Sequence, residues 1–228
     1  MDTEKGMKNF IERAKKVYDL KELERLGLTP DLVQRDMIIL FMAMLLKWNK
    51  TAGLVSPKDE SNLFIRHFCD SLQPLLLFGF KKSARILDIG SGGGFPSIPI
   101  RIFRSDLSFV LVESNRKKGM FLKEVKEKLG FQNVDVFIGR SEKIPKTMGL
   151  FDYVESRGVG TLRAFAHLAK PYLAPDGRMY TFKSKQFQEE LDEITSNKNK
   201  EGIGIAEIAE YDLANQILGL NLVSLSIL

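Results

Sequence analysis

An aspartate and three glycines at alternate positions are the residues of this chain with the clearest chemistry: Asp88, Gly90, Gly92 and Gly94. They lie in the segment RILDIGSGGGFPSIPI, residues 85–100, whose apolar start predicts a short buried strand. Glycine tolerates positive φ and lets a ligand touch the main chain, and a helix that begins after such a turn directs its first N–H groups at that ligand. The segment therefore predicts the nucleotide end of a doubly wound α/β domain, with Asp88 available to a cation directly or through water.

The spacing of these glycines separates two classes of nucleotide site. A dinucleotide fingerprint, G-x-G-x-x-G, that began at Gly90 would need its last glycine where Phe95 stands. The observed D-x-G-x-G-x-G string instead resembles the cofactor loop of class I methyltransferases that use S-adenosylmethionine (SAM). That nucleoside has ammonium and sulfonium charges and no pyrophosphate. A glycine-rich turn that holds another nucleotide, or no ligand, is the alternative interpretation.

Polar residues also follow the next two strands of the pattern. Glu113 ends the second predicted strand, 19 residues after Gly94 (113 − 94), where an acid can accept both hydroxyls of a ribose. The third predicted strand runs into residues 139–142, and backbone groups near Ser141 and Glu142 could bind the edge of an adenine. An incidental acid at a strand end and a polar loop that caps the sheet are the corresponding alternatives.

Two cations stand at the ends of the fourth and fifth predicted strands. Arg157 and Lys183 would reach the same rim, because ligands of open α/β sheets lie outside the carboxyl ends of the strands. Cations beside a sulfonium make sense where the phosphate backbone of a nucleic acid binds. Two solvated surface cations are an equally good interpretation of the spacing alone.

Motifs of other methyl-transfer chemistries are missing after the fourth predicted strand. There is no N/D-P-P-Y string, which argues against methylation of an exocyclic amine, and no Pro-Cys nucleophile for attack through pyrimidine C5. A guanine N7 already has an unshared electron pair, so an enzyme for that atom can work by alignment alone. This inventory favours a ring nitrogen, and it is also compatible with O- or N-methylation of a small molecule.

The elements that must position these residues fall into two parts. Residues 7–26 and two further segments, which begin at Thr29-Pro30 and Ser56-Pro57, have helical spacing, and Pro74 ends or bends the last of them. From residue 84 strands alternate with helices, which predicts a parallel sheet wrapped by helices, and two later apolar runs predict a closing antiparallel hairpin. The predicted strands are Arg85–Ile89, Ser108–Glu113, Val134–Ile138, Asp152–Glu155, Met179–Lys183, Ile203–Ile208 and Leu220–Ile227, and the helices between them are Ser97–Phe103, Asn115–Leu129, Thr161–Tyr172 and Gln186–Asn197.

Composition sets outer limits on function. A chain of 228 residues, 44% of them hydrophobic, suits one large domain or a domain with a cap, and a net charge of +5 favours a polyanionic partner such as nucleic acid. The single cysteine, Cys69, excludes an internal disulfide and a multi-cysteine metal site, and His67 and His167 lack metal-ligand spacing. Because no apolar run reaches ~18 residues, we expect neither a signal peptide nor a membrane span, and a reducing cytoplasm fits the cysteine content.

Five segments, taken in order, resemble the signatures of one family. They are KWNKTAGLVSPKDESNLFIRHFCDSL, LDIGSGGGFPSIPI, VESNRKKGMFL, GRSE and ESRGVGTL. Between about Leu40 and Lys185 the chain resembles the bacterial 16S rRNA guanine-N7 methyltransferases, also called glucose-inhibited division protein B. The resemblance implies a class I SAM-dependent methyltransferase of the α/β, Rossmann-like type, with a seven-stranded mostly parallel sheet and an N-terminal helical extension. We expect this extension or cap to occupy residues 1–80 and the SAM-binding domain to occupy residues 81–228.

The resemblance also implies roles for individual residues. The expected cofactor contacts are Asp88, Gly90, Ser91, Gly92, Gly94, Phe95, Glu113, Ser141, Glu142 and Arg157. The residues expected on the substrate side are Asn49, Lys50, His67, Asp70 and Ser71, and those expected in catalysis are Arg157, Lys183 and Arg140. The basic residues expected to help hold RNA are Lys47, Lys50, Arg66, Arg101, Arg104, Arg116, Lys117, Lys118 and Lys183.

The cofactor implied by the resemblance is SAM, with S-adenosylhomocysteine as product and without a metal. The implied partner is 16S rRNA or the small ribosomal subunit, bound by a cytoplasmic monomer that does not contact a membrane. The chain departs from the family pattern at Gly53, Val55, Glu155, Ser156, Gly158 and Gly160, which bears on the substrate and leaves cofactor binding intact. Two other functions are open at this point: a class I methyltransferase for a small molecule or protein, and a non-catalytic SAM-binding module.

Overall fold

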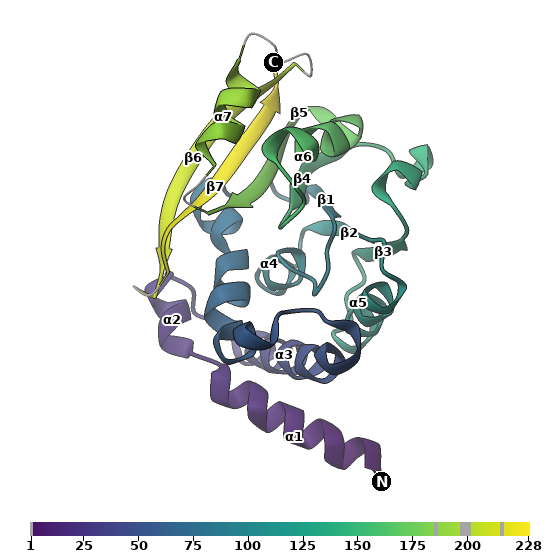
Figure 1. The fold of residues 1–228 in the computed structure, drawn as a ribbon. Coiled ribbons are helices and arrows are strands. Elements are labelled where there is room, and N and C mark those ends of the chain that lie inside the picture. The colour runs from purple at the N-terminus through teal and green to yellow at the C-terminus, as the bar shows by residue number, and fades with distance from the viewer. Residues whose placement is uncertain (1, 185–186, 197–201, 215–216) are drawn as a thin grey trace.

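A seven-stranded sheet forms the centre of the molecule (Figure 1). The computed structural model describes residues 2–184, 187–196, 202–214 and 217–228. The strand order is β3-β2-β1-β4-β5-β7-β6, in which β1 to β5 run parallel and β7 runs antiparallel to both of its neighbours. This confirms the predicted Rossmann-like fold with a mostly parallel sheet. The strands are β1 (Arg85–Ile89), β2 (Ser108–Glu113), β3 (Val134–Ile138), β4 (Phe151–Ser156), β5 (Leu173–Lys183), β6 (Ile203–Leu213) and β7 (Ile217–Ile227).

The first three strands have the predicted bounds, whereas the later strands are longer. The sequence predicts that β5 begins at Met179, but it begins at Leu173. Pro175 and Gly177 interrupt the apolar pattern there, and the structure absorbs them in a register irregularity opposite β4. β6 and β7 form the predicted antiparallel hairpin, and each strand extends beyond its prediction towards the turn that joins them.

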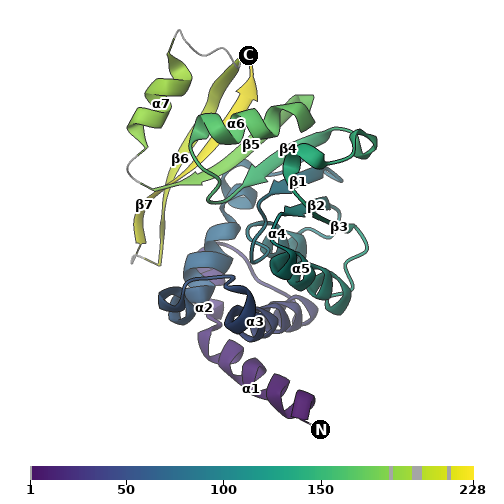
Figure 2. The same cartoon turned by 45° about the vertical axis from the view of Figure 1, so that its right-hand side comes forward.

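Helices cover both faces of the sheet (Figures 1 and 2). On one face lie α3 (Leu32–Ala52), α4 (Ser97–Phe103) and α5 (Arg116–Lys128), and on the other lie α6 (Leu162–Ala169) and α7 (Gln188–Thr195). The predicted helix over residues 161–172 ends as an α-helix with α6 and continues as a 3₁₀ turn. Residues 186 and 197, the predicted ends of the next helix, lie outside the described residues.

The N-terminal extension is a set of helices that packs over α4 and α5. It contains α1 (Asp2–Val17), α2 (Leu20–Arg25) and α3, followed by the short segments η1 (Pro57–Asn62), η2 (Phe64–Cys69) and η3 (Pro74–Phe78). The ring of Phe41 in α3 meets that of Phe95 edge-on, with centroids 5.5 Å apart. The extension therefore shares one hydrophobic cluster with the glycine turn after β1. Within the extension α1 packs against α3, and its N-terminal end projects from the rest of the molecule (Figure 2).

Two predicted helix starts need correction. The helix α3 is capped by Asp31 rather than Thr29: a carboxylate oxygen of Asp31 accepts the Gln34 N–H at 2.7 Å, and the Gln34 side chain accepts the Asp31 N–H at 2.9 Å. This reciprocal capping box satisfies two backbone donors where threonine would satisfy one. Ser56 precedes η1 as predicted, but its hydroxyl donates to Asp59 at 2.7 Å instead of accepting from the backbone.

Neither a membrane span nor a metal cluster is found in the described part of the chain. None of its helices combines the length and the apolar character that crossing a bilayer requires. The same residues contain no group of three or more histidine, cysteine, aspartate or glutamate side chains placed to hold a metal ion.

Candidate active site

A two-lobed cleft lies where the strand order reverses, between β1 and β4, which is where open α/β sheets bind ligands. The main lobe has a volume of about 340 Å³, and the side lobe next to it has a volume of about 200 Å³. Gly90 and Val159 line both lobes and mark the boundary between them. The main lobe is further lined by Leu54, His67, Ser91, Gly92, Gly93, Phe95, Glu113, Lys118, Arg157 and Gly158, and the side lobe by Ile89, Val112, Ser114, Gly139, Arg140, Ser141, Glu142 and Leu168.

The turn after β1 needs glycine for reasons of both conformation and space. Gly90 and Gly94 have φ values of 79° and 84°, in the region that disfavours side chains. A Cβ on Gly90 would lie 2.9 Å from a methyl group of Val159, and one on Gly94 would lie 2.7 Å from Ile98. The N–H groups of Gly90 and Ser91 both donate to the Val112 carbonyl, at 2.9 and 3.0 Å, so the turn is fixed to β2.

Glu113 connects the glycine turn to the start of α5. One carboxylate oxygen accepts the Gly92 N–H at 2.9 Å, and the other accepts the Asn115 N–H at 2.7 Å. Each oxygen retains a lone pair for a further donor, because a carboxylate offers about four acceptor sites. The carboxylate thus lines the main lobe in a fixed orientation and can still accept hydroxyl groups.

The side lobe is formed largely by the segment after β3. Arg140, Ser141 and Glu142 all line it, although Arg140 was expected in catalysis, and Ser141 Oγ donates to the Glu142 carboxylate at 3.2 Å. The Tyr172 hydroxyl donates to the Ser141 carbonyl and holds the segment from the far side. This lobe offers backbone groups and apolar walls from Ile89 and Leu168 to a planar ligand.

Beneath the glycine turn lies a buried pair of carboxyl groups that neither lobe exposes. The Ser97 hydroxyl is 2.9 Å from Asp88 Oδ2 and 2.7 Å from Glu155 Oε1, and both acids are completely buried. A hydroxyl has one proton to donate, so one of the two acids carries a proton and donates it to Ser97 Oγ. Burial raises the pKa of both acids, the neighbouring Asp88 charge raises that of Glu155 further, and the hydrogen bond with Ser97 opposes both shifts. Asp88 therefore supports the turn from below.

Arg157 brings together three distant parts of the chain at the main lobe. Its Nη2 lies 2.7 Å from Asp70 Oδ2 and donates to the Arg66 carbonyl at 2.6 Å, while the Tyr211 hydroxyl donates to Asp70 Oδ1 at 2.6 Å. The guanidinium carbon lies 5.7 Å from the centroid of the Phe182 ring. Nη1 of Arg157 is buried and has no hydrogen-bond partner among the described residues. The guanidinium is thus held on one side and has unused donors on the other.

His67 lines the same lobe as a neutral imidazole. Burial, and to a smaller extent the Arg157 charge, lower its pKa to about 4, although Asp59 opposes the shift. Its Nε2 is buried without a hydrogen-bond partner among the described residues and lies 3.7 Å from Asp59 Oδ2. The ring packs against Phe95 with centroids 5.3 Å apart. His67 therefore adds no positive charge to the lobe at neutral pH and is a weak base there.

The other residues expected on the substrate side line neither lobe of the cleft. The Asn49 side chain accepts the N–H groups of Leu54 and Val55 at 2.7 and 2.9 Å, which places Leu54 in the main lobe. Lys50 Nζ lies over the Phe10 ring at 5.0 Å, so this lysine reaches towards α1. Ser71 is buried and donates to the His67 carbonyl at 2.5 Å.

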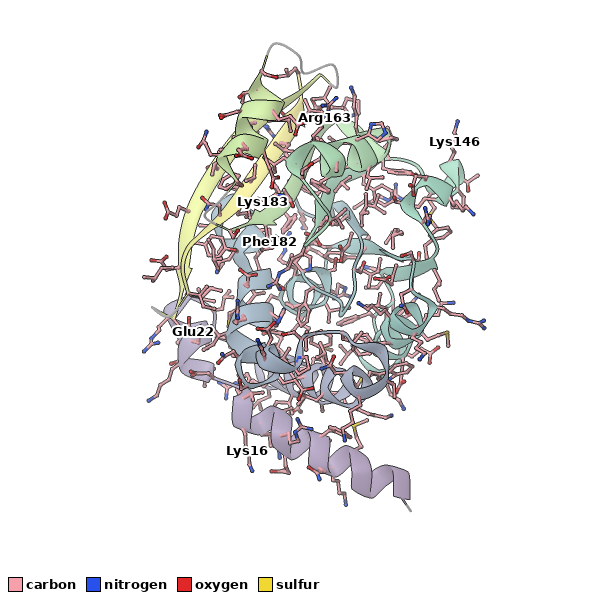
Figure 3. All side chains as sticks on the ribbon, in the orientation of Figure 1. Lys16, Glu22, Lys146, Arg163, Phe182 and Lys183 are labelled. Atoms are coloured by element: carbon pink, nitrogen blue, oxygen red, sulfur yellow. The ribbon has the colours of Figure 1, made fainter. Side chains whose placement is uncertain are left out.

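Lys183 occupies the end of β5 but lines neither lobe (Figure 3). Its Nζ lies 2.7 Å from Glu190 Oε2 and donates to the Gly160 carbonyl at 2.9 Å. Glu190 also accepts the Leu162 N–H at 2.7 Å. The ion pair thus holds the start of α6, next to the Gly158–Gly160 segment that bounds the cleft.

Three contributors to the site were not singled out from the sequence. Val159 divides the two lobes, and its position between Gly158 and Gly160 was the only local signal for it. Glu190 and Tyr211 pair with predicted site residues from elements far along the chain. Tyr211 gave no signal, because the strand that carries it was predicted to end at Ile208.

Comparison with known proteins points in one direction. Residues 34–215 match the GidB family, described as rRNA small subunit methyltransferase G. The ribosomal RNA small subunit methyltransferase G of Clostridium beijerinckii is 32% identical over 213 residues, which cover 91% of this chain and 89% of that protein. The protein of the same name from a Geobacter species is 32% identical over 205 residues, covering 90% of this chain and 93% of its own length.

Solved structures show the same fold at low sequence identity. A SAM-dependent methyltransferase from Aquifex aeolicus has a TM-score of 0.55 and 18% identity, covering 81% of this chain and 98% of its own. A variant of MtNAS in complex with S-adenosylmethionine has a TM-score of 0.54 and 16% identity, covering 96% of this chain and 88% of its own. These likenesses agree with the strand order and the position of the cleft.

Proposed function

The chain belongs to the GidB family of rRNA small subunit methyltransferases, and from this premise we propose that it methylates N7 of one guanine in 16S rRNA, using SAM. When bound, SAM supplies the methyl group that the guanine accepts. The observation that carries the proposal is the two-lobed cleft at the strand reversal, which combines a glycine turn, a fixed carboxylate and an arginine with unused donors.

The cofactor fits the residues that form the two lobes. A Cβ at Gly90 would lie 2.9 Å from Val159, so a side chain there would narrow the boundary between the two lobes, across which a nucleoside must extend. Glu113 would accept the ribose hydroxyls, and the segment at Ser141 and Glu142 would flank the adenine in the side lobe. Asp88 would act indirectly, by holding the turn through Ser97.

The main lobe suits an acceptor that needs no proton removed before it reacts. The pKa of His67, about 4, makes that imidazole a poor general base at neutral pH, and its neutral form does not repel a sulfonium. Arg157, which lines the main lobe, would bind an oxygen of the RNA, such as guanine O6 or a phosphate. Alignment of a ring nitrogen by Arg157 and the walls of the lobe would then suffice.

We also propose a division of labour along the chain. Residues 81–228 would form the SAM-binding domain, and residues 1–80 would form the cap that supplies Leu54, His67 and Asp70 to the RNA side. Lys118 and Arg140 line the cleft itself and would contact RNA phosphates beside the target base. We propose that the protein acts as a cytoplasmic monomer, without a metal and without a membrane.

Methyl transfer to ribosomal particles tests this function directly. Purified protein and SAM with a tritiated methyl group would be incubated with small subunits from cells that lack the protein, with free 16S rRNA, and with a metabolite extract. We expect label in the rRNA, recovered as 7-methylguanine at one position that is unmodified in the deletion strain. Label confined to a metabolite or a protein would support the alternative methyltransferase, and SAM binding without transfer would indicate a binding module.

A further inference from the structure

The hydroxyl of Tyr211 joins the C-terminal hairpin to a residue that holds Arg157 of the cleft. Tyr211 lies in β6, in the C-terminal hairpin, and its hydroxyl donates to Asp70 Oδ1 at 2.6 Å across 141 residues of sequence. The second oxygen of Asp70 lies 2.7 Å from Nη2 of Arg157, which lines the main lobe. A continuous chain of polar contacts therefore runs from the hairpin through the extension to the cleft.

The two polar contacts of the Asp70 carboxylate are not readily replaced by other groups. The Asp70 side chain is 6% exposed, so water cannot readily replace the tyrosine as a donor to Oδ1. Arg157 is the other group that holds the carboxylate, and the second side of its guanidinium has no partner among the described residues. If Asp70 turned or became protonated, the Arg157 guanidinium would keep its contact with the Arg66 carbonyl and lose the carboxylate that fixes its orientation with it.

We propose that Tyr211 is a positioning residue for methyl transfer: its hydroxyl fixes Asp70, and Asp70 orients the Arg157 guanidinium in the main lobe. This inference rests on the proposed function of the cleft. The groups that face the Asp70 carboxyl are Tyr211 from β6, Arg157 from the segment after β4, and Arg66 and Cys69 from η2. Burial raises the pKa of Asp70, whereas Arg157, Tyr211 and Arg66 lower it, so removal of the tyrosine hydroxyl raises the pKa further.

A merely structural role would have a different signature. A hydroxyl that only satisfied a buried carboxylate would affect unfolding and leave the reaction rate of the folded enzyme unchanged. A positioning role alters the rate and the pH at which activity is lost, while SAM affinity, which depends on the glycine turn and Glu113, stays the same. The chain contains a matched control, because the Tyr18 hydroxyl is also buried but has no partner among the described residues.

The test compares the wild type with Tyr211→Phe and Tyr18→Phe. For Tyr211→Phe we expect kcat on unmethylated small subunits to fall about tenfold at neutral pH, and its acidic limb to move up by about one pH unit, as loss of a hydrogen bond to a charged group predicts. SAM affinity by calorimetry should stay within about twofold, because no hydrogen bond of the glycine turn changes. Tyr18→Phe should match the wild type in all three measurements, and thermal unfolding would confirm that each variant is folded.

A double-mutant comparison makes the result decisive. If Tyr211 acts through Asp70, Tyr211→Phe should have no further effect on kcat in an Asp70→Asn background. Additive losses, or a Tyr211→Phe variant with the kcat and pH profile of the wild type, would overturn the inference. Wild-type protein that failed to methylate the subunits would instead overturn the proposed function. The pKa of Asp70, measured by carbon NMR in the free protein, would then still decide whether Tyr211 controls this carboxyl.

Discussion

The two walls of the cleft are built in different ways. The wall proposed to bind SAM, called the cofactor wall below, is mostly main chain: glycines with positive φ, N–H groups fixed to Val112, and one carboxylate that accepts from Gly92 and Asn115. All of it comes from one stretch of sequence between β1 and the start of α5. The wall opposite is formed by side chains of the extension and of the segment after β4, among them His67 and Arg157, and the contacts that hold it span 91 and 141 residues.

The two walls should therefore respond differently to substitution. A wall of main chain is set by conformation and admits no side chain, whereas a wall of paired side chains depends on each partner being charged and in place. Changes on the cofactor wall should therefore act on SAM affinity, and changes on the opposite wall should act on turnover. The predictions below test that separation, beginning with the largest effect.

Replacement of Arg157 by alanine should remove turnover and spare SAM binding. We expect kcat to fall about 100- to 1,000-fold, the usual cost of removing one preorganised donor from an active site. Lysine at this position should fail almost as badly, because an ammonium cannot hold Asp70 and a substrate oxygen with one planar fork. Single-turnover transfer and SAM calorimetry on the same preparations would check this. A parallel loss of SAM affinity would erase the distinction between the walls.

Replacement of Gly90 by alanine should have the converse effect. A methyl group at position 90 would obstruct the space beside Val159 where the two lobes meet, so SAM affinity should fall about thirtyfold, or about 2 kcal/mol. Gly130→Ala is the control, since Gly130 has φ 67° but open space around its Cα and lies outside the cleft. Calorimetry would measure both variants. Equal SAM affinities for the two would show that strain alone, and not the approach of a ligand, explains the glycine.

Glu155→Gln should change how stability depends on pH. The raised pKa values of the buried pair mean that its contribution is complete below the ordinary carboxyl pKa of about 4 and is lost as the pH rises through the folded-state value, about 7 for Asp88. The amide needs no proton and can donate to Ser97 Oγ, which leaves the Ser97 proton for Asp88, so the variant should gain about 1–2 kcal/mol over the wild type between acidic and mildly alkaline pH.

Urea unfolding at a series of pH values would measure this gain. Asp135→Asn serves as the comparison, because its carboxylate is exposed and pairs only with Lys126 at the surface. A Glu155→Gln curve parallel to that of the wild type would mean that Ser97 does not join two acids that share one proton.

Single lysines at the mouth of the cleft should have the smallest effects. Lys118→Ala should lower the slope of log K against log salt for RNA binding by about one, as expected for one phosphate contact. Lys126→Ala should leave the slope unchanged, because that lysine pairs with Asp135. Filter binding over a range of salt concentrations would measure both. If RNA binding by the wild type did not depend on salt, this surface would not contact RNA phosphates.

The cofactor wall was predictable from the sequence because its determinants are local. The strands β1 and β2 have the predicted bounds, and Gly90 and Glu113 lie in the cleft, where their positions at the ends of these strands placed them. Alternation and turn chemistry within about thirty residues are enough for such a unit.

The opposite wall was predictable only in part. Asp70 and Arg157 were singled out, but their pairing depends on how η2 meets the segment after β4, which no local pattern encodes. Lys183 was placed at the correct rim, yet its partner Glu190 lies in a helix whose packing decides where the lysine points. The early start of β5 was not predicted, because Pro175 and Gly177 interrupt the apolar pattern of the strand; the structure accommodates them in a register irregularity opposite β4.

The order of the last two strands has a consequence for synthesis of the protein. β7 lies between β5 and β6, so β6 has no place in the sheet until β7, which the ribosome makes later, has been inserted. The hairpin turn then reaches α2, where the Ala214 N–H donates to buried Glu22 at 3.1 Å. Glu22 of the N-terminal extension thus gains its Ala214 donor only when β6 and β7 have paired, and the nascent chain should acquire catalytic competence abruptly, once β7 has been made.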